Sequence, residues 1–219
     1  MVTLEMVKAD HEVQIYLNKA HEHLGAIGYT EHGARHAELV SRISHNILTH
    51  LEYPERQAEL AAIAGYLHDL GNVVSRHNHG QTGAMIALSI LKRLGMPPEE
   101  IAEVLAAIGN HEEEYGQPVN ILSAALILAD KSDVHRSRVR NPDLATFDIH
   151  DRVNYAAERS FLRVNGAQKT ITLELKIDTS ISPVMDYFEI FLTRMVMCRR
   201  AATYLGCNFE LTINETRLL

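Results

Sequence analysis

The sequence predicts a mainly α-helical fold, a helical bundle that carries a small α+β segment at its C-terminal end. Two observations support this prediction. Up to about residue 158, apolar residues recur at helical spacing between glycine and proline breaks. Beyond residue 159 the pattern alternates with a period of two around an Asn165-Gly166 dipeptide, which favours a β-hairpin. We therefore expect a helical domain over residues 1–158 and a small appendage over residues 159–219.

Six helices are expected in the first part, each from an apolar stripe with a start or stop signal. Gly25 and Gly28 end the first, Thr30 caps the second, and Pro54 opens the third. Gly95 ends the fourth. The six helices are expected over residues 4–24, 30–51, 54–69, 80–94, 97–111 and 121–130. Further helix is expected over residues 131–138 and 143–159.

The C-terminal part is expected to fold as a hairpin, a helix and a strand. Residues 161–178 alternate on both sides of the Asn-Gly turn, and residues 208–215 alternate again. Between them, residues 183–204 show an amphipathic helical stripe that Gly206 ends. That stripe fits packing on the chain's own hairpin and equally fits the contact surface of a homodimer, and the pattern does not separate the two.

Composition limits the partners. The chain of 219 residues has a net charge of −7, from 28 acidic and 21 basic side chains. A nucleic-acid partner is therefore not expected, because nucleic acids are bound by clustered Lys and Arg. The charge does not exclude a small phosphorylated substrate. The two cysteines form no CxxC pair and no apolar run is long enough to cross a bilayer, so we expect a soluble, cytoplasmic protein without a membrane partner.

Six His and Asp residues occupy comparable places in the expected helices. They are His36 within the second helix, His68 and Asp69 at the end of the third, His79 at the start of the fourth, His111 at the end of the fifth and Asp130 at the end of the sixth. Helix bundles build metal sites from such facing side chains. A divalent cation also offsets the cost of burying Asp beside apolar runs. Imidazole and carboxylate together suit Mn, Fe, Co, Ni or Zn rather than Ca.

These residues carry a family resemblance. His36, the His68-Asp69 pair in GYLHDLGN and Asp130 in LILADKSD resemble the H…HD…D signature of the HD-domain phosphohydrolases. The additional histidines, His79 and the one in NHEE, are similar to those of the two-metal branch that includes the HD-GYP cyclic-dinucleotide phosphodiesterases. The resemblance covers about residues 20–140.

The resemblance implies one or two divalent metal ions (Mn, Fe, Co, Ni or Zn, with Mg also allowed). The implied ligands of the first are His36, His68, Asp69 and Asp130. Asp69 would bridge to a second ion held by His79 and His111, and Asp69 and His68 would be the catalytic pair. The implied activity is hydrolysis, by metal-activated water, of a phosphoester or phosphoanhydride of a nucleotide or another small phosphorylated metabolite.

Three departures separate the chain from the cyclic-dinucleotide enzymes. Asn72 stands where their HDxGK motif has lysine, Asn110 stands where a second histidine would precede Glu, and the GYP signature is missing. Activity on cyclic dinucleotides is therefore not expected. A non-catalytic module that binds metal and ligand, and a di-iron oxygenase on the same fold, stay open as alternatives.

Substrate contacts are expected from residues around the proposed metals, namely His32, Asn72, Lys131, His135 and Arg138. His32 lies one helical turn before His36. The last three share one face if residues 131–138 are helical, and arginine forks suit phosphate oxygens. A solvated basic face is the alternative interpretation of this segment. His77 is the alternative to His79 in the same loop.

Overall fold

The computed structural model describes residues 1–219 and confirms the mainly α-helical fold with a small C-terminal sheet. The helices are α1 (Leu4–Ala9), α2 (His11–Ala26), α3 (Ala34–His50), α4 (Glu55–Leu67), α5 (His79–Arg93), α6 (Pro98–Gly109), α7 (Ile121–Lys131), α8 (Ile149–Ala156) and α9 (Val184–Tyr204). Short 3₁₀ turns are η1 (Leu70–Val73), η2 (Arg136–Arg138) and η3 (Leu144–Thr146). The strands are β1 (Ala157–Asn165), β2 (Thr170–Ile177), β3 (Asn208–Ile213) and β4 (Thr216–Arg217).

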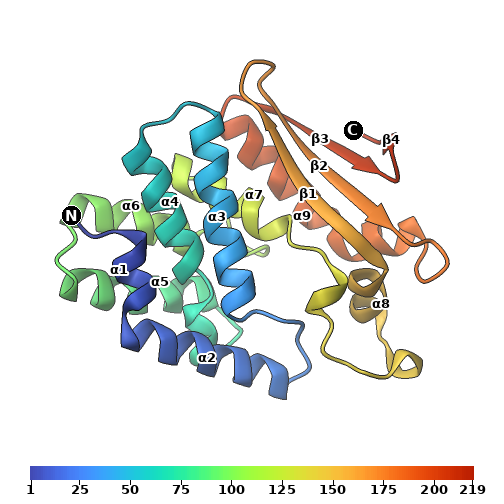
Figure 1. Cartoon of the computed structure of the whole chain (residues 1–219), viewed down its shortest axis with the longest axis horizontal. Coiled ribbons are helices and arrows are strands. Elements are labelled where there is room, and N and C mark those ends of the chain that lie inside the picture. Colours follow the sequence, from blue (N-terminus) through green and yellow to red (C-terminus); the bar gives the residue numbers. More distant parts are fainter.

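The pair α3 and α4 forms the centre of the bundle, and α7 packs against both (Figure 1). Gly65 permits the close contact of α3 with α4, because a Cβ atom here would lie 2.9 Å from the Ser41 Cα. Both α4 and α7 are buried around most of their circumference. The close pairing brings the start of α3 next to the end of α4.

The sheet has the order β1-β2-β3-β4, with β1 at one edge beside α3 (Figure 1). β1 and β2 form the predicted antiparallel hairpin, in which Leu162 pairs with Leu173. β2 and β3 are parallel, with Leu173 opposite Leu211. A parallel pair needs a crossover, and α9 supplies it while packing against α7 and the sheet. The expected hairpin, helix and strand are therefore present, with the short β4 added.

The first expected helix is wrong as a single element. Asp10 divides it into α1 and α2, because its carboxylate accepts from the backbone N–H groups of Glu12 and Val13 and so caps a new helix. The second helix is also shorter than expected. It begins at Ala34 after Gly33 and not at Thr30.

The helix expected over residues 131–138 is also wrong. α7 ends at Lys131, and only the turn η2 follows. Tertiary contacts override helical propensity here: the Asp133 carboxylate is held by Arg35 from α3, and His135 caps η2 through the Ser137 N–H. Of the helix expected over residues 143–159, only η3 and α8 are helical, and Ala157 already belongs to β1.

One continuous cluster of buried apolar side chains includes residues from both parts of the chain, such as Leu126 of α7 and Phe191 of α9. Because this core includes both parts, the domain boundary expected between residues 158 and 159 stays a prediction. None of the helices combines the length and apolar character that crossing a bilayer requires.

Candidate metal centre

The six expected ligands converge on one buried centre. They are His36 on α3, His68 at the end of α4, Asp69 after it, His79 at the start of α5, His111 after α6 and Asp130 on α7. Each of these residues is at most 9 % exposed. Gly71 makes part of this convergence possible, since a Cβ there would lie 1.9 Å from the His79 carbonyl oxygen. The turn that carries Asp69 can thus lie directly against the first turn of α5.

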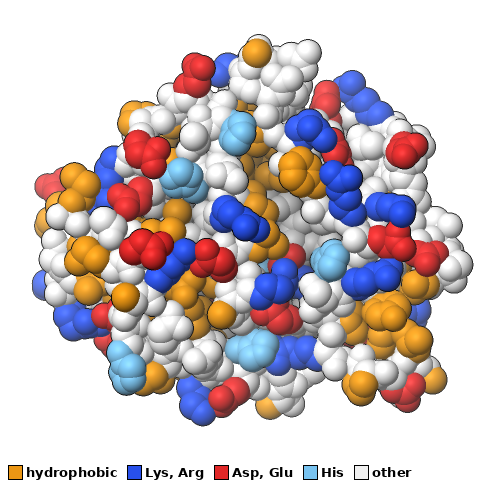
Figure 2. Space-filling view, in the orientation of Figure 1, with side chains coloured by type: hydrophobic (Ala, Val, Ile, Leu, Met, Phe, Trp, Pro, Cys, Tyr) orange, Lys and Arg blue, Asp and Glu red, His pale blue; other side chains and the backbone are white.

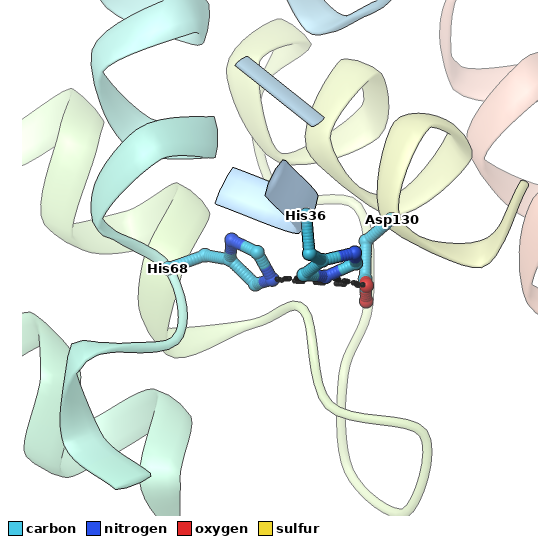
Figure 3. Close-up of side chains that lie close together, drawn as sticks. All are labelled: His36, His68 and Asp130. Carbon is cyan, nitrogen blue, oxygen red and sulfur yellow. Dashed lines mark hydrogen bonds and ion pairs between the residues drawn. The ribbon is translucent and has the colours of Figure 1, made fainter. Parts of the chain in front are cut away.

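The first cluster consists of His36, His68 and Asp130 (Figure 3). The two imidazole Nε2 atoms are 3.2 Å apart. Asp130 Oδ1 lies 3.3 Å from His36 Nε2 and 3.7 Å from His68 Nε2. Asp69 Oδ2 approaches the same atoms, at 3.7 Å from His36 Nε2 and 3.4 Å from His68 Nε2. Four donor atoms from three helices and one turn therefore face a single point.

The second cluster lies on the other side of Asp69. His68, Asp69 and His111 offer donor atoms within 4.8 Å of one another. The Nε2 atoms of His79 and His111 are 3.1 Å apart, and His79 Nε2 lies 3.4 Å from Asp69 Oδ1. One carboxylate oxygen of Asp69 thus faces each cluster, which is the arrangement that a bridging ligand needs.

The four histidines are oriented by their other ring nitrogen. His36 Nδ1 donates to Asp133 Oδ2 at 2.7 Å, and His68 Nδ1 donates to the Gly65 carbonyl oxygen at 2.8 Å. His79 Nδ1 donates to the Arg76 carbonyl oxygen at 3.0 Å, and His111 Nδ1 donates to the Ile108 carbonyl oxygen at 2.6 Å. With the proton on Nδ1, each Nε2 presents its lone pair to the centre. Metal-binding histidines are commonly oriented in this way.

The chemistry of these residues fits divalent metal ions. Because these rings donate through Nδ1, the facing Nε2 atoms each present a lone pair. A positive group between two such lone pairs would bind both. Their spacing of 3.1–3.2 Å is close to the distance of about 3.3 Å between two nitrogens bound to one zinc-sized ion. Asp69 Oδ2 is buried and has no hydrogen-bond partner. Leaving a buried carboxylate oxygen unpaired costs free energy, and a cation would remove that cost.

Electrostatics keeps the carboxylates charged. Burial favours the neutral carboxyl, but the histidines around Asp69, His68 foremost, lower its pKa well below its usual range. Burial acts on Asp130 in the same way, but Lys131, His36 and His68 together lower its pKa well below the usual range. Burial lowers the pKa of His111, so that its ring is neutral and able to coordinate. Asp130 and Asp133 raise the pKa of His36 despite burial and Arg138, so a metal ion must compete with a proton for this ring.

Two acidic residues that the sequence did not single out support the ligands. Asp133 accepts from His36 and from Arg35, at 2.7 and 2.8 Å. Glu112 lies 3.1 Å from His79 Nδ1 and accepts from the Gly80 N–H. Both occur within the motif segments, Asp133 in LILADKSD and Glu112 in NHEE. Their proximity to the motif histidines and aspartates was the available signal.

A pocket of about 300 Å³ adjoins the centre. Its walls include Tyr29, His32 and Arg138 from the helical part of the chain, with Phe191 and Arg194 from α9. Arg76 also lines it, with Nη1 at 3.4 Å from His79 Nε2 and 3.9 Å from Asp69 Oδ1. Arg76 and Arg194 were not predicted, because no local pattern distinguishes them from surface arginines.

Only some of the residues predicted to contact substrate line this pocket. His32 and Arg138 line the pocket and contact each other at 2.9 Å. Asn72 donates to Asp69 Oδ1 at 2.8 Å, so it orients an expected metal ligand. Lys131 is buried and donates to Asp130 Oδ2 at 2.6 Å. His135 lies outside this pocket and lines a different hollow between α3 and β1, because the helical face expected to align it with Lys131 does not form.

Residues 31–136 match the family model of the HD domain. This match supports membership of the HD superfamily, whose members are largely metal-dependent hydrolases. It is also similar to "Uncharacterized protein MJ1020" of Methanocaldococcus jannaschii, with 29% identity over 174 residues. The matched segment covers 69% of this chain and 66% of that protein, just under two thirds of its length.

Proposed function

We propose that this protein is a divalent-metal-dependent phosphohydrolase that acts on a nucleotide or another small phosphorylated metabolite. The observation that carries the proposal is the position of Asp69. Its two oxygens face two His-rich clusters, and Oδ2 is buried without a hydrogen-bond partner. A bridging carboxylate between two metal positions is the core of a binuclear hydrolytic site.

When bound, divalent cations supply Lewis-acid polarisation of phosphoryl oxygens and make water acidic enough to act as a nucleophile. The protein's own residues hold and orient this machinery. Asn72 fixes one oxygen of Asp69, and the Nδ1 contacts fix each imidazole ring. Burial, reinforced by Arg138, lowers the pKa of His32, so its ring stays neutral beside the pocket.

The pocket supports a small anionic substrate. Arg76 and Arg194 place guanidinium groups on its wall, and a guanidinium can bind two phosphate oxygens at once. Tyr29 and Phe191 offer aromatic surface to the rest of the molecule. A volume of about 300 Å³ lies at the lower end of the range for small-molecule sites. These features favour a compact phosphorylated metabolite over a polymer.

The test is phosphate release from a panel of nucleotides, cyclic nucleotides and sugar phosphates. The protein is stripped with a chelator and reloaded separately with Mn, Fe, Co, Ni, Zn or Mg. We expect metal-dependent release that falls by at least about a thousandfold in Asp69→Asn. Glu189→Gln is the matched control, since it makes the same carboxylate-to-amide change on the exposed side of α9.

A wild-type protein that binds metal in stoichiometric amounts but releases no phosphate with any metal would contradict the proposal. The pocket would then fit a non-catalytic binding module better. Oxygen-dependent turnover with iron alone would instead indicate an oxygenase.

A further inference from the structure

A second hollow lies between α3 and the edge strand β1 and has a volume of about 520 Å³. It shares no lining residue with the pocket at the metal centre. Figure 2 shows it near the middle of this face of the molecule, with Lys or Arg and His side chains around its rim. The mechanism proposed above makes no use of this α3–β1 groove.

The groove has an aliphatic floor. Leu39 and Ile43 of α3 face Leu162 and Val164 of β1 across it. All four side chains are only partly buried, so they leave apolar surface open to a ligand. Helical spacing places Leu39 and Ile43 one turn apart on the same face of α3, and alternation along β1 places Leu162 and Val164 on one face of the strand.

The rim of the groove is cationic. Arg35 and Arg42 of α3 and Arg163 of β1 line it. Arg163 is paired with Glu174 at 2.6 Å, and Arg35 is paired with Glu31 and Asp133. Arg42 is exposed and has no carboxylate within ion-pair distance. The single carboxylate in the lining belongs to Asp133, which is buried and already held by His36 and Arg35. In a chain with a net charge of −7, the unpaired guanidinium of Arg42 beside apolar surface favours an anion with an apolar body.

We propose that the α3–β1 groove binds a phosphorylated small molecule, whose phosphate lies on Arg42 and its neighbours and whose apolar part lies on Leu39 and Ile43. The volume falls within the range of about 300–1,000 Å³ for small-molecule sites. Both nucleotides and alkyl phosphates have this chemistry. The site goes beyond the proposed hydrolase activity and does not depend on it.

The groove is also close to the metal centre without being part of it. Arg35 lines the groove and donates from Nη2 to Asp133 Oδ2 at 2.8 Å. The same oxygen accepts from His36 Nδ1 at 2.7 Å. A small molecule bound to Arg35 would therefore be linked through Asp133 to His36, an expected metal ligand. Binding must be tested with the metal removed, so that the two sites can be told apart.

The test is calorimetric titration of the full chain in excess chelator with AMP, decyl phosphate and inorganic phosphate as probes. We expect AMP or decyl phosphate to bind, and inorganic phosphate to bind more weakly because it cannot use the aliphatic floor. Arg42→Glu should weaken binding by about tenfold or more. The stronger of the two organic probes identifies whether the apolar part is a base or an alkyl chain.

Two variants make the assignment specific. Arg200→Glu introduces the same charge change on the exposed side of α9 and should leave binding unchanged. Arg76→Glu alters the pocket at the metal centre and should leave unchanged the part of the binding that Arg42→Glu removes. Absence of binding by both organic probes would overturn the proposal. So would a loss of binding in Arg76→Glu together with normal binding in Arg42→Glu.

Discussion

Arg194 donates from Nε to Glu113 Oε1 at 2.6 Å, which joins α9 to the loop that carries His111. Glu113 lies 3.7 Å from Lys131 Nζ, and Lys131 donates to Asp130. A chain of charged contacts therefore leads from the C-terminal helix to a predicted metal ligand. Arg194 also lies over the Phe191 ring, 4.2 Å from its centroid. The C-terminal segment thus forms part of the wall of the pocket.

Replacing Arg194 with Gln should weaken substrate binding, because it removes a guanidinium from the pocket wall. If the proposed hydrolase activity holds, KM should rise about tenfold while kcat changes little. Steady-state kinetics on the best substrate of the panel measures both values. Arg200→Gln, on the exposed side of the same helix, serves as the control. An unchanged KM in Arg194→Gln would show that the arginine has only a structural role.

Replacing Asp133 with Asn should weaken metal binding by roughly 10–100-fold, because the ring of His36 loses its charged acceptor. Competition with a coloured chelator measures the affinity directly and needs no substrate. A thermal unfolding curve of the same sample shows whether the fold is retained. Glu189→Gln should bind metal like the wild type. Equal affinities in Asp133→Asn and the wild type would mean that this contact does not orient the ligand.

Replacing Gly65 with Ala should destabilise the fold by about 1–3 kcal/mol. The added Cβ would lie 2.9 Å from the Ser41 Cα, and backbone cannot move aside as a flexible side chain can. Gly109→Ala is the matched control, since its nearest new contact is at 4.0 Å. That change should be neutral or slightly stabilising. Urea unfolding of both variants compares their free energies, and a stable Gly65→Ala variant would contradict the close packing of α3 and α4.

Alkaline conditions should destabilise the wild type partly through Cys198, whose pKa burial raises to about 12 from an ordinary value of 9.0. The unfolded chain loses the thiol proton above pH 9 while the folded chain retains it. The stabilising contribution is therefore complete below pH 9 and is lost between pH 9 and 12. By pH 10.5 the loss is about 2 kcal/mol. Urea unfolding of wild type and Cys198→Ala at pH 8 and 10.5 tests this, and equal losses in both proteins would refute it.

The candidate metal centre was largely predictable because the six expected ligands form an ordered motif at or near helix ends. All six expected ligands meet in the structure. Asp133, Glu112 and Arg194 were not predicted, because their roles depend on contacts between distant segments. The contact of Arg35 with Asp133, for instance, spans 98 positions in the sequence. No local pattern contains that information.

The elements were predictable where apolar periodicity coincided with strong stop signals. The hairpin marked by Asn165-Gly166, whose loop covers residues 166–169, and the helix ending before Gly206 are examples. The helix boundaries were predicted wrongly where a polar residue could either lie on a helix surface or end the helix. In the sequence, Asp10 resembles an ordinary polar residue on a helix surface, but in the structure it caps α2. Asp133 was predicted to be helical, but its carboxylate accepts hydrogen bonds from Arg35 and His36 of α3, which prevents α7 from continuing.

The parallel pairing of β2 with β3 has a consequence for the newly synthesised chain. β3 contains residues 208–213, so the sheet is completed only after these residues have left the ribosome. Every predicted metal ligand precedes residue 131 in the order of synthesis. Long-range strand pairing is slow compared with local helix formation. A nascent chain can therefore assemble its metal ligands before α9 is fixed in place and adds the last wall of the pocket.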